Sequence, residues 1–135
     1  MAEATSHTRG FVEDQFQRIG KTGFDSTFLD ILSDDLKWTV TGTSPLAGVY
    51  TSKAEYKTKV LDRLFAKLAK NPVPDVNLIL ADGKWATVYF ETHGAVGKNG
   101  VDFSMAYCWL CKVEKEKIVE VVGFYDSTKV IALFS

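Results

Sequence analysis

Apolar residues recur at helical spacing in the first half of the chain. Across residues 8–19 they fall on one face of a helix, with charged residues elsewhere. Asp25 is the expected N-cap of a short second helix, which ends at the Asp-Asp pair before the first strand. A third helix is predicted to start at Ser52, where Glu55 completes a capping-box pattern, and to end at Asn71-Pro72.

The second half of the chain alternates apolar and polar positions with the period of a β-strand. Strands are predicted over residues 37–43, 76–81, 85–95, 101–113 and 117–125. Asp82-Gly83, Lys98-Asn99-Gly100 and the charged run 114–116 supply the turns between the last four strands. Helices first and an antiparallel meander last predict an α+β domain, in which helices cover one face of a curved sheet. Such a sheet leaves a cavity between itself and the helices, which is a common ligand site.

The composition is that of one soluble domain over residues 1–135. Hydrophobic residues make up 46% of the chain and aromatic residues 13%, enough for an aromatic-rich core. The net charge is −1 with both signs interspersed, so no nucleic-acid partner is expected. We find neither a membrane-length apolar run nor a signal-peptide pattern, and therefore expect a cytoplasmic protein without a membrane partner. The two cysteines are expected to be free thiols.

Several short motifs in order carry a resemblance to a known family. They are Trp38-x-Val40-x-Gly42, Pro45-Leu46-Ala47-Gly48-x-Tyr50, Asn99-Gly100, Tyr107-Cys108-Trp109, and Lys117-Ile118-Val119-Glu120-Val121 through Asp126. Together they resemble the SnoaL-like, ketosteroid-isomerase-related branch of the nuclear-transport-factor-two-like superfamily. The resemblance implies a cone-shaped fold, with about three helices from the N-terminal half packed on a curved, mostly antiparallel sheet. It also implies a deep apolar pocket and a homodimer.

The chain departs from this family at the positions that carry its named reactions. Val122-Gly123 stand where relatives often place an Arg-Glu or Arg-Asp pair. Thr41 and Cys108 lie near the two aspartates of ketosteroid isomerases, and Thr92 and Gly94 lie near the Arg and Asp of epoxide hydrolases. Neither reaction keeps its residues here, so the resemblance implies the pocket and leaves the chemistry open.

Three side chains are candidates for proton transfer. Glu91 and His93 leave the predicted strand on the same face, and histidine titrates near neutral pH, so the pair is a candidate general base. The alternative is that this face points to solvent or to a dimer partner. Asp126 ends a strand, where a carboxylate with a raised pKa serves as acid or base. Its alternative is a capping role, with the carboxylate accepting from the amides of Thr128 or Lys129.

Polar and apolar ligand contacts are expected from other positions. Tyr50, Tyr56 and Tyr107 are candidate donors to a ligand carbonyl, and such donors stabilise an enolate. The alternative for each is a buried ring whose hydroxyl meets a backbone partner. The remaining predicted substrate contacts are Trp38, Cys108 and Met105.

Redox, metal and nucleotide sites are not indicated. Cys108 and Cys111 form a Cys-x-x-Cys pattern, but residues three apart on a strand face opposite sides of the sheet. The segment from Gly94 to Lys98 lacks the full phosphate-loop spacing. With only two histidines, a conventional multi-histidine metal site is not expected, and we predict no cofactor.

The sequence thus leads to two functional hypotheses. The first is a cofactor-free isomerase, cyclase or dehydratase that acts by acid/base chemistry on a small hydrophobic carbonyl compound, of polyketide- or terpene-like character. The second is a non-catalytic ligand-binding or interaction domain of the same fold. In both, the partner is a small hydrophobic molecule, and we expect a homodimer through the open face of the sheet.

Overall fold

The computed structural model describes residues 2–135. Its helices are α1 (Ala2–Thr22), α2 (Ser26–Asp30), α3 (Lys53–Tyr56), the π-helical turn η1 (Lys57–Leu61), α4 (Asp62–Lys67) and α5 (Ser127–Leu133). Its strands are β1 (Leu32–Val40), β2 (Gly48–Tyr50), β3 (Leu68–Lys70), β4 (Pro74–Asp82), β5 (Trp85–Thr92), β6 (Val96–Gly97), β7 (Ala106–Glu114) and β8 (Lys117–Phe124). Within residues 2–135, no helix has the length and apolar character needed to cross a membrane.

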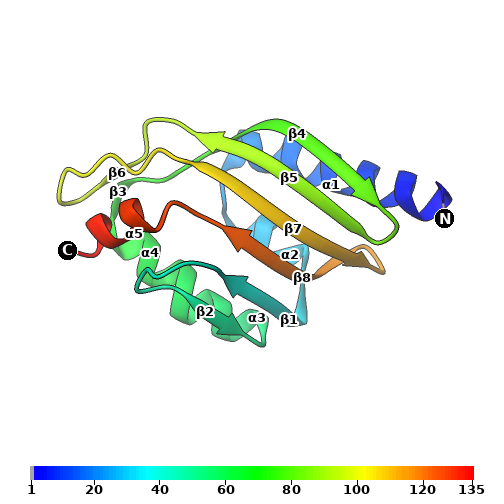
Figure 1. The fold of residues 1–135 in the computed structure, drawn as a ribbon, viewed down its shortest axis with the longest axis horizontal. Helices are drawn as coiled ribbons and strands as arrows, with labels where there is room; N and C mark the ends of the chain where they lie inside the picture. The colour runs from blue at the N-terminus through cyan, green and yellow to red at the C-terminus, as the bar shows by residue number, and fades with distance from the viewer. Residues whose placement is uncertain (1) are drawn as a thin grey trace.

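The main sheet has the strand order β2-β1-β8-β7-β5-β4 (Figure 1). Strands β4, β5, β7 and β8 form the predicted antiparallel meander. The earlier strand also belongs to this sheet, because β1 pairs with β8 in parallel register. Helix α1 packs along β4 and β5 behind the sheet. The predicted α+β architecture, with helices on a curved and mostly antiparallel sheet, is confirmed.

The sheet has one buried face and one open face. On β5 the inward residues are Ala86, Val88, Phe90 and Thr92, all buried. On the open face, Leu78, Leu80, Tyr89 and Phe124 are 40–52% exposed. Burial on one face only fixes the register of the strands, since a slip by one residue would turn every apolar side chain to the other face.

The second helix is shorter than predicted and the first strand is longer. Asp25 caps α2 as predicted, accepting from the amide of Thr27 at 2.9 Å. The helix nevertheless ends at Asp30, because the amide of Ile118 donates to the carbonyl of Ile31 at 2.8 Å and Leu32 already pairs with β8. Pairing with a distant strand overrides a local helical pattern here.

The helical segment 53–67 begins as predicted, since the Ser52 hydroxyl accepts from the amide of Glu55 at 3.0 Å. The Glu55 carboxylate reaches back to the amide of Thr51 at 2.9 Å, one residue before the position that the capping-box pattern predicts. The segment ends at Lys67 instead of Asn71, because β3 pairs with β6.

Two features between and after the long strands were not predicted. The strand expected over 101–113 starts only at Ala106, because the Asp102 carboxylate accepts from the amide of Ser104 at 2.9 Å and turns the chain. Helix α5 follows β8 and carries Val130 into the core. Its C-terminal carbonyls accept from the side-chain amide of Asn99, at 3.1 and 3.3 Å.

The turn between β7 and β8 holds two residues in an unfavourable conformation. Lys115 and Glu116 have φ angles of 50° and 60°, a region that favours Asn and Gly. We therefore expect Lys115→Asn/Glu116→Gly to raise the free energy of unfolding by about 1–2 kcal/mol in urea denaturation. As a matched control, Gly83→Ala in the neighbouring hairpin between β4 and β5 (φ 61°) should lower it. Equal or lower stability of the double variant would contradict this explanation of the turn.

Candidate functional site

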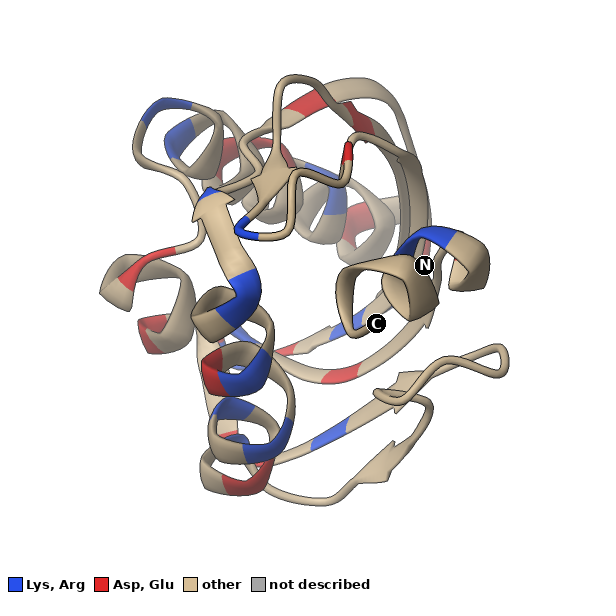
Figure 2. Cartoon of the chain, turned by 90° about the vertical axis from the view of Figure 1, so that its left-hand side faces the viewer, with Lys and Arg blue, Asp and Glu red and all other residues tan. Residues whose placement is uncertain are grey.

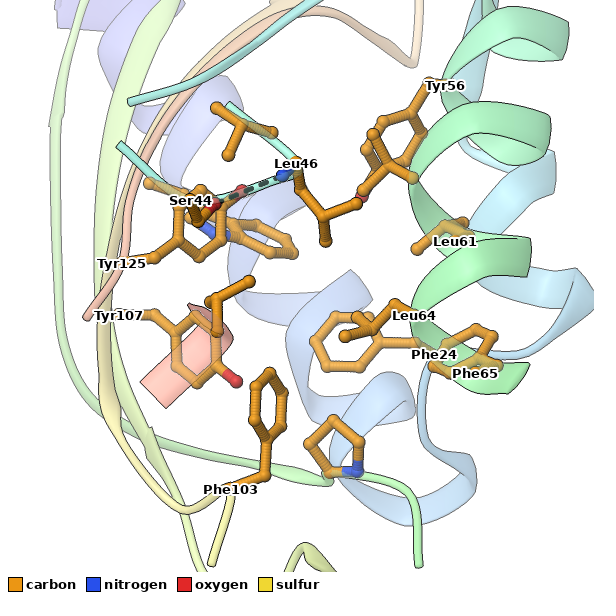
Figure 3. A pocket seen from close by; sticks show the side chains of 15 residues that line it. Phe24, Ser44, Leu46, Tyr56, Leu61, Leu64, Phe65, Phe103, Tyr107 and Tyr125 are labelled. Carbon is orange, nitrogen blue, oxygen red and sulfur yellow. Dashed lines mark hydrogen bonds between the residues drawn. The ribbon is translucent and has the colours of Figure 1, made fainter. Parts of the chain in front are cut away.

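An apolar pocket lies between the helical segment 53–67 and the inner face of the sheet (Figure 3). Figure 2 shows the backbone of this helical segment and of α5 on the inner side of the curved sheet. The pocket encloses a cavity of about 60 Å³. The lining residues are Phe24, Val40, Ser44, Leu46, Tyr56, Val60, Leu61, Leu64, Phe65, Pro72, Phe103, Tyr107, Trp109, Tyr125 and Val130. Its polar side chains are one serine hydroxyl, three phenols and one indole, and none of these lining residues is charged.

The helical side of the pocket depends on the π-helical turn η1. The amide of Asp62 donates to the carbonyl of Lys57, five residues earlier, so this turn is wider than an α-helical turn. Tyr56 and then two adjacent pairs, 60–61 and 64–65, line the pocket as a result. The apolar residues that recur at every fourth position of this segment therefore line the pocket as well as packing in the core.

The sheet side of the pocket carries the other two phenols. Tyr107 comes from β7 and Tyr125 follows β8, and Figure 3 shows both rings on the wall opposite Tyr56. The Tyr125 hydroxyl accepts from Trp38 Nε1 at 2.9 Å. Tyr56 stacks on Trp38 with ring centroids 4.1 Å apart. Trp38, which lies behind the pocket wall, thus contacts a phenol on the helical side and a phenol on the sheet side of the pocket.

All three pocket phenols are neutral at physiological pH. Burial raises the pKa of Tyr107 to about 12, against a smaller lowering by the Thr92 hydroxyl. Burial also raises the pKa of Tyr56 and of Tyr125, and the nearby phenols reinforce the rise for both. Each phenol is therefore available as a hydrogen-bond donor.

The raised pKa of Tyr107 makes stability depend on pH in the alkaline range. A tyrosine that stays protonated in the folded state up to pH 12, but ionises near pH 10 when unfolded, stabilises the protein below pH 10. We expect this contribution, about 2–3 kcal/mol, to disappear between pH 10 and pH 12. Urea denaturation across this pH range should show a smaller loss of unfolding free energy for Tyr107→Phe than for wild type. Tyr89→Phe, on the open face, is the control and should behave like wild type; equal losses in all three proteins would contradict the argument.

The three predicted proton-transfer residues do not line this pocket. His93 is 68% exposed, and its Nε2 lies 3.9 Å from Oδ2 of Asp75. Glu91 pairs with Ala106 on the outer face of the sheet, because the inward positions of β5 are its even-numbered residues. Asp126 is the N-cap of α5 and accepts from the amide of Thr128 at 3.1 Å. The capping alternative for Asp126 is confirmed, and the placement of these three side chains in the cavity is corrected.

The predicted ligand contacts divide into two groups. Tyr56 and Tyr107 line the pocket as expected. Tyr50 does not, because its hydroxyl donates to the carbonyl of Leu46 at 2.7 Å and holds the loop before β2. Trp38 is buried behind Tyr56, and Met105 is buried where its amide donates to the Thr92 hydroxyl at 3.3 Å.

The two cysteines lie on opposite faces of β7, as predicted. Cys108, expected among the ligand contacts, pairs with Tyr89 and Phe124 on the outer face and is half-buried. Cys111 is fully buried on the inner face, where burial raises the pKa of its thiol to about 12. Both are free, so the pattern is structural and not a redox pair.

Sequence reasoning missed Tyr125 and Trp109 as pocket residues. Tyr125 stands next to the Asp126 that the strand-end argument selected, and the available signal was the glycine two residues before it. A β-carbon at Gly123 would lie 2.2 Å from the Tyr125 hydroxyl oxygen. The absence of a side chain at Gly123 makes room for this phenol.

No family model matches the sequence, and no curated protein matches it. Solved structures do match. An NTF2-like protein from Burkholderia thailandensis aligns with a TM-score of 0.77 at 18% identity, over 95% of this chain and 97% of its own. An epoxide hydrolase of the LEH-like kind from M. tuberculosis aligns with a TM-score of 0.68 at 16% identity, over 96% and 90% of the two chains.

A third similar structure is a protein with a ketosteroid isomerase-like fold from Catenulispora acidiphila, in complex with trimethylamine. It aligns with a TM-score of 0.64 at 15% identity, over 78% of this chain and 77% of its own. Identities at this level establish the fold. The chain therefore has the nuclear-transport-factor-two-like fold, which it shares with ketosteroid isomerase-like proteins.

Proposed function

We propose that this protein binds a small apolar molecule with a carbonyl oxygen in the pocket between the helical segment 53–67 and the sheet. The observation that carries the proposal is an apolar pocket whose phenols are neutral and still have donor capacity. Tyr56 and Tyr125 both line the pocket, and among the described residues no acceptor takes the proton of either hydroxyl. A ligand oxygen in the cavity can accept from such a phenol.

The size of the cavity limits the ligand. A cavity of about 60 Å³ has room for only a few water-sized groups, so a ligand that enters without moving the walls has few non-hydrogen atoms. A polyketide- or terpene-like molecule would need the walls to open. Trimethylamine, in the complex with the Catenulispora protein, is a comparably small molecule.

Isomerase-type catalysis is the second candidate. It is supported by the ketosteroid isomerase-like and epoxide hydrolase structural neighbours and by phenols that would stabilise an enolate. An isomerase also needs a base to remove the proton, and no carboxylate or imidazole is among the residues that line this pocket. Binding without turnover is thus the function that the geometry supports better.

Cyclopentanone, with six non-hydrogen atoms, is a suitable probe. We expect it to bind with a Kd of about 1 mM in an NMR titration, which corresponds to about −4 kcal/mol. Leu64→Trp fills the cavity and should abolish binding, whereas Ile131→Trp, at an exposed position of α5, should not. If wild type does not bind, or if Leu64→Trp binds equally well, the pocket is not the ligand site. Exchange of the ketone α-protons with D₂O, catalysed by wild type and lost in Tyr107→Phe, would favour the isomerase instead.

The open face of the sheet also supports a proposed homodimer. Its exposed apolar side chains are Val49, Leu78, Leu80, Trp85, Tyr89 and Phe124. A row of alternating charge crosses the same face, since Lys37 pairs with Glu120 and Glu120 with Lys112. Two copies related by a two-fold axis would cover the apolar patch and pair unlike charges.

Light scattering should give twice the 15.0 kDa chain mass for wild type and the single mass for Leu78→Lys/Leu80→Lys. A monomer mass for wild type at high concentration would refute the dimer.

A further inference from the structure

The Tyr125 hydroxyl is held from two sides. Trp38 Nε1 donates to its oxygen at 2.9 Å, and the bare α-carbon of Gly123 faces the oxygen from another side. The backbone φ angle of Gly123 is not in the left-handed region, so glycine is needed here for space and not for conformation. The phenol is thus fixed in position before any ligand arrives.

The hydrogen-bond capacity of this phenol is only partly used. A phenol has one proton to donate and lone pairs that accept, and Trp38 occupies one lone pair. Among the described residues, none accepts the Tyr125 proton. Tyr125 lines the pocket, so an acceptor in the cavity is a candidate partner for that proton.

A second indole stands beside the same oxygen. Trp109 Nε1 is the one buried side-chain nitrogen or oxygen without a hydrogen-bond partner among the described residues, and Trp109 is 5% exposed. Its ring meets that of Trp38 edge-on, with centroids 4.8 Å apart. Burial raises the pKa of Tyr125, and the indoles of Trp38 and, to a smaller extent, Trp109 oppose this rise. The bond from Trp38 Nε1 to the Tyr125 hydroxyl is formed, whereas Trp109 Nε1 forms none.

We infer that Tyr125 is the residue that donates to the ligand's acceptor oxygen, with Trp38 and Trp109 as positioning residues that act through it. When Tyr125 donates its proton, its oxygen becomes a stronger acceptor, because hydrogen bonds in a chain polarise one another. The unpartnered Trp109 N–H can then complete its bond to that oxygen. The inference rests on the proposed function and narrows its ligand to compounds that offer an acceptor, such as ketones, esters or amides.

Two probes of nearly the same shape isolate the acceptor. Cyclopentanone carries an oxygen where methylenecyclopentane carries a methylene group. In ¹⁵N-labelled protein the indole protons of Trp38, Trp85 and Trp109 are resolved reporters, and Trp85 on the outer face is an internal control. We expect wild type to bind the ketone about tenfold more tightly than the alkene. The Trp109 indole proton should move downfield with the ketone only, and that of Trp85 should not move.

Substitutions then assign the preference to residues. Tyr125→Phe should bind both probes with equal affinity, while its alkene affinity stays at the wild-type value. Trp109→Phe keeps most of the ring and should lower the ketone preference about threefold, which provides a second test if Tyr125→Phe fails to fold. Tyr89→Phe is the matched control and should keep the full preference.

The outcomes separate this inference from the proposed function. If the ketone preference persists in Tyr125→Phe, or if the Trp109 proton does not move, the acceptor site is elsewhere and the inference is overturned, while the pocket remains the binding site. If wild type binds the two probes equally, the inference fails and apolar binding stands. If wild type binds neither, the proposed function fails and this inference fails with it.

Discussion

Trp109→Ala should lower the free energy of unfolding by about 3–5 kcal/mol and the Tm by about 10–20 °C. Trp109 lies at the centre of the aromatic core. Its ring packs against Phe16, Phe24, Phe28, Trp38 and Phe90, with centroid distances from 4.8 to 6.0 Å. Removing it leaves a large cavity whose walls come from two helices and two strands, so they cannot collapse without moving whole elements.

Thermal and urea denaturation measure this effect, and Trp85→Ala is the matched control. Trp85 is 38% exposed on the outer face, so its loss should cost less than about 1 kcal/mol at the same protein concentration. A cost for Trp109→Ala no greater than that for Trp85→Ala would show that the aromatic cluster does not organise the core.

Gly123→Ala is expected to remove the ligand preference for carbonyl compounds and to lower the free energy of unfolding by about 1–3 kcal/mol. The added β-carbon would lie 2.2 Å from the Tyr125 hydroxyl oxygen and 2.6 Å from Cζ, far inside contact distance. The ring would have to move, which breaks its bond to Trp38 and turns the phenol away from the cavity. A single methyl group thus tests the structural and functional arguments together.

Gly10→Ala provides the matched control for this substitution. Gly10 lies inside α1, and a β-carbon there would meet nothing within 4 Å. Because alanine favours a helix over glycine by about 1 kcal/mol, Gly10→Ala should stabilise the protein without affecting binding. Effects of the same sign and size at both glycines would contradict the explanation given for Gly123.

The sequence predicted the meander because strand alternation and turn chemistry are local. Asp82-Gly83 and the charged run 114–116 join paired strands as expected. The β1 boundary was wrong because Ile31 and Leu32 bond to β8, a strand far away in the chain. A contact of this kind leaves no trace in the local pattern.

The candidate site was harder to predict than the fold, for a related reason. The alternation of apolar and polar residues along a strand predicts which residues share a face of the sheet, but it does not predict what covers that face. Glu91 was therefore a site candidate, although the face of the strand that meets the core carries Thr92 instead. Tyr125 escaped notice because its role depends on Trp38 and on the space at Gly123, and only the folded structure brings these together.

The most direct test of the central proposal compares two variants in one cyclopentanone titration. Glu91→Gln/His93→Ala/Asp126→Asn removes the polar candidates that lie outside the pocket, and Leu64→Trp fills the pocket itself. The account predicts wild-type affinity for the triple variant and no binding by Leu64→Trp. Loss of binding in the triple variant, with both proteins folded and Leu64→Trp still binding, would contradict it.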